Sequence, residues 1–216
     1  MPGTCCHIAF AEMVYRKLSS CMPFQGDEFK SGNLIPDLST EDKKITHYRK
    51  NASIEGLYIP DMKQVEKDLF KDDPIKLGIY SHLYLDERFI EEFLIPEFIW
   101  YKPRMVIINP RNSMEWYPTE FFKPNGIYYK AFDEINKCLI RDGYISMETI
   151  KKMPDILPNT GIPVYDNRQE KAWKKEVEEY ITTKREYTGD VFDYEKLVRF
   201  MENTSTELAR KIIKEK

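Results

Sequence analysis

A polar pair on the apolar face of a predicted helix limits how this chain can fold. From Pro74 to about Leu94, apolar residues recur at the spacing of one helical face, which predicts a helix with a buried stripe. His82 and Asp86 lie on that stripe one turn apart, so both face the core. Gly78, one turn earlier, leaves room for another group to approach the helix closely. Because a buried carboxylate is costly unless it is paired or bound to a metal ion, Asp86 needs partners from elsewhere.

The rest of the pattern predicts helices joined by long loops. Thr4 is expected to cap a helix that runs to about Ser20, with His7 at the start of its inward face. Residues 21–60 have no helical period and contain several prolines, so a long structured loop is expected there. The remaining elements are expected to be a helix over 61–71, a strand over 105–108, a short helix capped by Ser146, and helices over 128–141, 165–183 and 191–214. Since strands and helices do not alternate, we predict an all-α fold, a multi-helix bundle with long structured loops.

Length and composition narrow the class of protein. The 216 residues favour a single helical domain over 1–216, in which the helices of 126–216 complete the core. No apolar run approaches the ~18 residues of a membrane span. The first residues lack the basic and apolar regions of a signal peptide, and the four cysteines form no C-x-x-C pair, so the expected location is the cytoplasm. A net charge of −3 argues against a nucleic-acid polymer as partner.

All three histidines are placed where they can serve a metal site. His7 and His82 lie on inward helical faces, and His47 lies in the segment between them, which also contains a carboxylate in an apolar stretch. A single inward histidine is more often an ordinary core residue than a metal ligand. By themselves, His82 and Asp86 are more often an ordinary buried hydrogen-bonded pair than part of a metal site. A histidine on each of two buried stripes favours a metal ion instead. The donors expected to converge are His7, Asp37, His47, His82 and Asp86, a set that suits zinc, with iron or manganese as alternatives.

Four fragments, in this order, carry a family resemblance. They are His-x3-Ala from His7, Gly-Asn-Leu-Ile-Pro-Asp ending at Asp37, Lys-x-Thr-His ending at His47, and Gly-x3-His-x3-Asp from Gly78 to Asp86. Over about residues 4–95 the chain resembles the zinc-dependent phospholipase C and single-strand nuclease superfamily, whose α-helical members hydrolyse phosphate esters at a metal cluster. The resemblance implies that Asp37, His47, His82 and Asp86 hold one metal ion. His7, with a bridging aspartate, would hold a second. Because no histidine follows His82, one or two zinc ions are expected rather than three.

The function that this resemblance implies is a metal-dependent phosphoester hydrolase. It would act on a small-molecule or lipid phosphodiester or phosphomonoester, with Asp37 orienting the attacking water and Arg49 holding the phosphate. A surface role is the alternative for Arg49. The alternative for the whole chain is a non-catalytic helical protein in which a structural or vestigial metal site supports an interaction module. The sequence contains no His-Asp dipeptide and no Gly-x-Ser-x-Gly elbow, which argues against His-Asp phosphohydrolases and serine hydrolases. Substrate identity and oligomeric state stay open.

Overall fold

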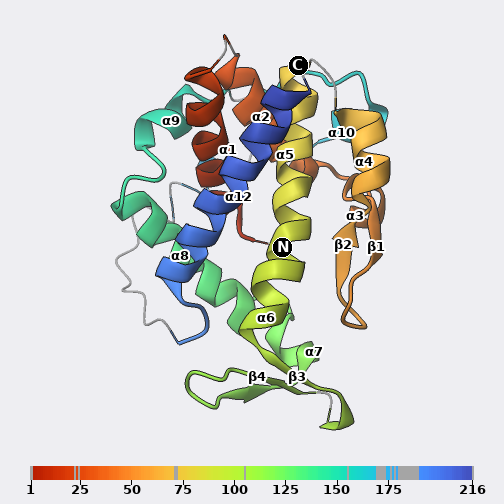
Figure 1. Ribbon diagram of the computed structural model, residues 1–216, viewed down its shortest axis with the longest axis vertical. Helices are drawn as coiled ribbons and strands as arrows, with labels where there is room; N and C mark the ends of the chain where they lie inside the picture. Colours follow the sequence, from red (N-terminus) through yellow and green to blue (C-terminus); the bar gives the residue numbers. More distant parts are fainter. Residues whose placement is uncertain are drawn as a thin grey trace.

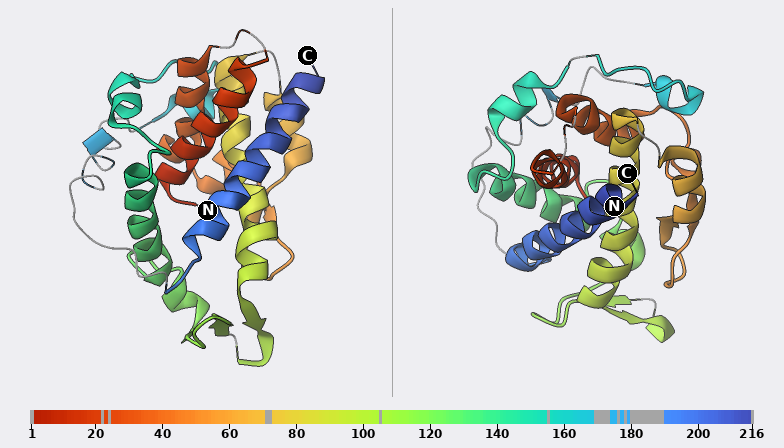
Figure 2. Two further views of the ribbon diagram at one scale, coloured as in Figure 1. Left: turned by 60° about the vertical axis from the view of Figure 1, so that its left-hand side comes forward. Right: turned by 45° about the horizontal axis from the view of Figure 1, so that its top comes forward.

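The fold is built on four helices that pack beside one another (Figure 1). The computed structural model describes residues 2–21, 23, 25–70, 73–104, 106–154, 156–168, 174–175, 177, 179 and 190–215. The four helices are α1 (Thr4–Ser19), α2 (Gly26–Leu38), α5 (Pro74–Arg88) and α12 (Tyr194–Lys214). Helix α2 packs against α1 and α5, and α12 crosses both α1 and α5 (Figures 1 and 2). None of the helices described here is both long enough and apolar enough to span a membrane.

Shorter elements connect and flank these helices. In chain order they are α3 (Lys43–Thr46), β1 (Arg49–Asn51), β2 (Tyr58–Pro60), α4 (Met62–Leu69), the π-helix η1 (Phe89–Leu94), α6 (Ile95–Glu97), β3 (Ile99–Tyr101), the 3-10 turn η2 (Lys102–Arg104), β4 (Val106–Ile108), β5 (Glu115–Trp116), α7 (Pro118–Phe121), α8 (Ile127–Arg141), α9 (Met147–Lys152) and α10 (Pro163–Asp166). Strands β1 and β2 pair antiparallel, as do neighbouring strands in the β3-β4-β5 sheet at the lower end of Figure 1. The protein is therefore mainly helical, as predicted, but the two small sheets correct the expectation of a purely all-α fold.

Most of the predicted elements are confirmed. Helices α4, α8 and α12 and strand β4 lie within about three residues of their expected bounds. The Asp73 carboxylate caps α5 by accepting hydrogen bonds from the backbone N–H groups of Ile75 (2.9 Å) and Lys76 (3.1 Å). The Ser146 hydroxyl caps α9 in the same way. Of the helix predicted over 165–183, the structure describes α10 at its start, and most of the remainder lies outside the described residues. The first helix is capped by Gly3 rather than Thr4.

The prediction of a loop over residues 21–60 is wrong, because α2 occupies a third of that segment. Helix α2 contains two glycines and Pro36, all poor helix formers, so its own residues give little helical signal. Packing against α5 stabilises it instead. A Cβ atom on Gly32 would lie 2.1 Å from the carbonyl oxygen of Ile75, and one on Gly78 would lie 2.1 Å from that of Phe29. Only glycine at both positions lets the two backbones approach so closely.

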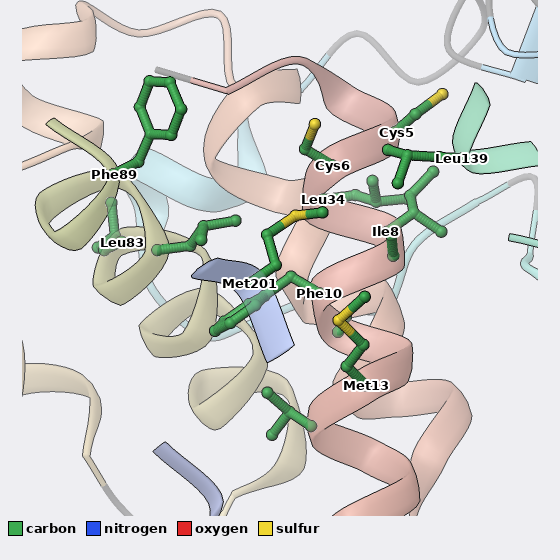
Figure 3. Packing of buried hydrophobic residues seen from close by; sticks show 14 of the residues in the cluster. Cys5, Cys6, Ile8, Phe10, Met13, Leu34, Leu83, Phe89, Leu139 and Met201 are labelled. Carbon is green, nitrogen blue, oxygen red and sulfur yellow. The ribbon is translucent and has the colours of Figure 1, made fainter. Parts of the chain in front are cut away.

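The apolar core surrounds α1 and α5. Ile8, Phe10 and Met13 of α1 share it with Met201 of α12, as Figure 3 shows. Leu83 and Phe89 extend the core along the helix that continues from α5. This packing holds α5 in place, and it surrounds the polar residues that the sequence places on the inward face of that helix.

Candidate metal centre

The helices bring the five predicted donors to one place. His7 lies in the first turn of α1, Asp37 near the end of α2, His47 directly after α3, and His82 and Asp86 in the second half of α5. The three histidines and Asp86 are at most 1% exposed, whereas the side chain of Asp37 is 25% exposed. Four donors are thus in the core, and the fifth lies between the core and solvent.

Asp86 is at the centre of the cluster. Its Oδ1 atom lies 3.3 Å from Nε2 of His7, and its Oδ2 atom lies 3.5 Å from Nε2 of His82 and 3.7 Å from Nε2 of His47. Asp37 closes the cluster, with Oδ1 3.4 Å from Nε2 of His47 and Oδ2 3.9 Å from Nε2 of His82. The rings of His7 and His82 are stacked, with centroids 3.6 Å apart and planes 8° apart.

These distances fit ligands that share metal ions. Tetrahedral ligands at ~2.1 Å from zinc are roughly 3.4 Å from one another, close to the 3.3–3.9 Å separations between the donor atoms. Two triads have ligand atoms that all lie within 4.8 Å of one another, His7 with Asp37 and His82, and His47 with His82 and Asp86. The donor cluster is therefore spaced for one ion or for two adjacent ions.

Unpartnered buried atoms in the cluster point to the same chemistry. Among the described residues, the Nε2 atoms of His7, His47 and His82 and both carboxylate oxygens of Asp86 are buried and have no hydrogen-bond partner. Buried polar atoms in folded proteins nearly always have one, because leaving them unpaired costs free energy. A cation bound among these atoms would satisfy all of them. The residues present therefore fit a metal ion better than an ordinary buried ion pair.

Outer contacts set which nitrogen of His82 faces the cluster. The Nδ1 atom of His82 lies 2.7 Å from the carbonyl oxygen of Asn33, to which only an N–H can donate, so Nε2 carries the lone pair of the neutral ring. Burial, with His7 beside it, lowers the pKa of His82 to about 3, so the ring is neutral near pH 7. With its amide oriented to satisfy both groups, Asn33 also donates to the carbonyl oxygen of His7 (3.0 Å) and accepts from the backbone N–H of His82 (3.2 Å). Sequence reasoning missed this role of Asn33, although the residue lies in the Gly-Asn-Leu-Ile-Pro-Asp fragment.

His47 is held by its neighbours in sequence and by a distant tyrosine. The Thr46 hydroxyl lies 2.7 Å from Nδ1 of His47, and the hydroxyl of Tyr165 donates to the carbonyl oxygen of Thr46 (2.8 Å). Tyr48 has a φ of 46°, a left-handed value that is uncommon outside glycine, where the chain turns from α3 into β1. This turn places His47 in the core while Arg49 lines a pocket. No sequence pattern connected Tyr165 to the site.

The pocket has a volume of about 550 Å³, and Asp37, Lys43 and Arg49 all line it. The ammonium group of Lys43 donates to Oδ1 of Asp37 (2.9 Å) and to the carbonyl oxygens of Pro36 and Asp37 (both 3.1 Å). Burial by itself would raise the pKa of Asp37, but the neighbouring His47 and the positive charge of Lys43 hold it well below its usual value. Asp37 is therefore a carboxylate that contacts both the donor cluster and the pocket. Lys43 was not predicted, although it precedes the Lys-x-Thr-His fragment directly.

Comparison with known proteins gives no relative by which to interpret this site. No family model matches the sequence, and no curated protein or solved structure shows a significant match. The interpretation of the donor cluster and its pocket therefore depends on their own geometry.

Proposed function

We propose that this protein is a metal-dependent phosphoester hydrolase with a phospholipase C-like helical bundle. Asp37, His47, His82 and Asp86 would hold one zinc ion, and His7 with a bridging aspartate a second, with iron or manganese as alternative metals. The observation that carries the proposal is the convergence of unpartnered imidazole nitrogens and carboxylate oxygens beside a pocket that contains cationic side chains. The substrate would be a small-molecule or lipid phosphodiester or phosphomonoester.

The residues around the pocket have distinct roles in this chemistry. When bound, zinc lowers the pKa of water to near 7 and polarises a phosphoryl oxygen. Asp37 is ionised and partly exposed, so it can accept a hydrogen bond from the attacking water and orient it. All three N–H groups of Lys43 are already used by Asp37 and Pro36, so Lys43 positions Asp37. Arg49, for which the described residues show no ion-pair partner, is left to bind the phosphate through its planar fork.

The burial of the cluster supports a second candidate function. His7, His82 and Asp86 are almost fully buried, as ligands of closed structural zinc sites are. In this case the metal would stabilise the bundle, and the protein would act as an interaction module without catalysis. The two functions make different demands on Asp37 and Arg49. A catalytic site needs both side chains in contact with a pocket, whereas a structural metal site does not.

Metal analysis and activity of matched variants test the proposal. Protein purified without added metal, or reconstituted with zinc, should hold one or two equivalents by mass spectrometry and hydrolyse members of a phosphoester panel. Chelator should abolish turnover, and zinc or manganese should restore it. Arg49→Ala should keep the metal but raise the KM for substrate. Lys50→Ala, which removes the next cation along β1, one that is ion-paired to Asp61, should change neither. Full metal content without turnover of any substrate in the panel would favour the structural site.

A further inference from the structure

A second pocket, largely apolar, adjoins the one that contains Arg49. Its volume is about 370 Å³, and its walls include Leu57, Trp100, Val106, Pro118 and Phe122. The residues come from the β1–β2 connection and from the segment that runs from β3 to the residue after α7. Most of this wall therefore lies outside residues 4–95, where the sequence motifs occur, and the function of residues 100–122 was not predicted.

The two pockets share part of their lining. Gly56, Leu57 and Phe122 line both of them. The two pockets are therefore neighbours, and a group esterified to a phosphate in the first pocket can extend toward the second. We propose that this apolar pocket binds an aromatic ring esterified to the phosphate, so that the substrate is an aryl or similarly ring-bearing phosphoester. This inference rests on the proposed function and specifies its substrate class.

The shape of the apolar pocket favours a flat ring. The rings of Trp100 and Phe122, which both line it, are nearly parallel, with planes 10° apart and centroids 6.4 Å apart, so a bound ring would pack against one of them rather than between them. Trp100 is held in place because its indole N–H donates to the carbonyl oxygen of Ile95 (3.0 Å), and Phe122 packs against the ring of Tyr128 at 5.2 Å. A ring that packs against a fixed aromatic side chain, by its face or its edge, gains stabilisation beyond the burial of its apolar area, which an alkyl chain does not gain.

The size of the apolar pocket limits what fits. Ligand pockets for drug-sized molecules range over about 300–1,000 Å³, and 370 Å³ is near the lower end of that range. Such a volume suits one ring system, and it is too small for a lipid with two long acyl chains. The pocket therefore favours a compact ring over a diacyl lipid.

Binding of phosphonates to the zinc-loaded protein tests this assignment without depending on turnover. Methylphosphonate and phenylphosphonate carry the same anionic group and differ only in the ring. Because the ring becomes buried, we expect calorimetry to show about tenfold tighter binding of phenylphosphonate.

Trp100→Ala should remove that preference and leave methylphosphonate binding unchanged. Trp100→Leu, which keeps apolar packing but has no flat face, should also reduce the preference for phenylphosphonate. This variant replaces Trp100→Ala in the test if the alanine variant folds poorly. Tyr117→Ala, which removes a 56% exposed aromatic side chain lining neither pocket, should have no effect.

Three other outcomes would overturn the inference, and they distinguish failure of the aryl assignment from failure of the proposed function. Equal affinity for the two phosphonates, with methylphosphonate still bound, would overturn the aryl assignment and leave the hydrolase proposal intact. Tighter binding of octylphosphonate than of phenylphosphonate would assign the pocket to an alkyl chain instead. If neither phosphonate binds protein that holds its metal, both this inference and the proposed function fail.

Discussion

The hydroxyl of Tyr165 donates a 2.8 Å hydrogen bond to the carbonyl oxygen of Thr46, across 119 residues of sequence. Both residues are fully buried, and the Thr46 hydroxyl in turn contacts Nδ1 of His47. Helix α10 thus supports the turn that places a candidate metal ligand. Outer contacts of this kind commonly matter for metal binding because they fix the orientation of the ligand.

Removing that hydroxyl should weaken metal binding more than it weakens the fold. We expect Tyr165→Phe to lower zinc affinity by about 10-fold or more, while the free energy of unfolding falls by only about 1 kcal/mol. A competition titration with a zinc indicator measures the first, and urea denaturation the second. Tyr80→Phe is the matched control, since it removes another buried tyrosine hydroxyl, one that donates to Glu66. Equal zinc affinities in the two variants would contradict the positioning role.

Metal should stabilise the fold through Asp86. The wild-type protein should gain about 2.7 kcal/mol at a zinc concentration one hundred times the Kd, seen as a rise in Tm. Asp86→Asn should gain much less, because the amide is a weaker ligand and carries no charge. Asp61→Asn, at a carboxylate paired with Lys50 on the surface, should behave as wild type. The same Tm in zinc and in chelator, after confirmed metal removal, would refute the site.

Gly78→Ala should destabilise the protein although alanine is the better helix former. In an open helix this substitution stabilises by up to about 1 kcal/mol. Here the new Cβ atom would lie 2.1 Å from the carbonyl oxygen of Phe29, so α2 and α5 have to separate. We expect a loss of about 1–3 kcal/mol in urea denaturation, together with weaker zinc binding. The sign of the change is decisive, since any stabilisation would mean that the helices are not in such close contact.

The metal-free protein should lose stability on acidification because His82 is buried. Its folded pKa of about 3 lies below the ordinary 6.5, so between these pH values the unfolded chain takes up a proton that the folded chain does not. The free energy of unfolding should therefore fall as the pH drops below about 6.5, by up to about 1.4 kcal/mol per pH unit for this residue. Urea midpoints in chelator at several pH values measure the slope. His82→Gln should have a shallower slope, and an unchanged slope would show that other groups cause it.

The candidate site was predictable where its residues follow a local pattern. His82 and Asp86 are polar residues on an apolar helical face, and the structure buries both completely. The scarcity of histidine made His7 and His47 conspicuous in the sequence, and both lie in the donor cluster. Lys43 and Asn33 are polar residues within or beside the same fragments, and no periodicity distinguishes them. Their roles became visible only when their hydrogen-bond partners were known.

Local sequence was enough to predict the strongly periodic or well-capped elements, such as α5, α8 and α12, because helix periodicity and capping act over a few residues. It also indicated that some group approaches Gly78 closely. That this group is α2 depends on contacts between segments far apart in the chain. Helix α2 has weak intrinsic propensity and forms against α5, with Gly32 and Gly78 allowing the two backbones to touch. The pockets and the support from Tyr165 are likewise set by tertiary packing, since each joins residues that no short-range pattern relates.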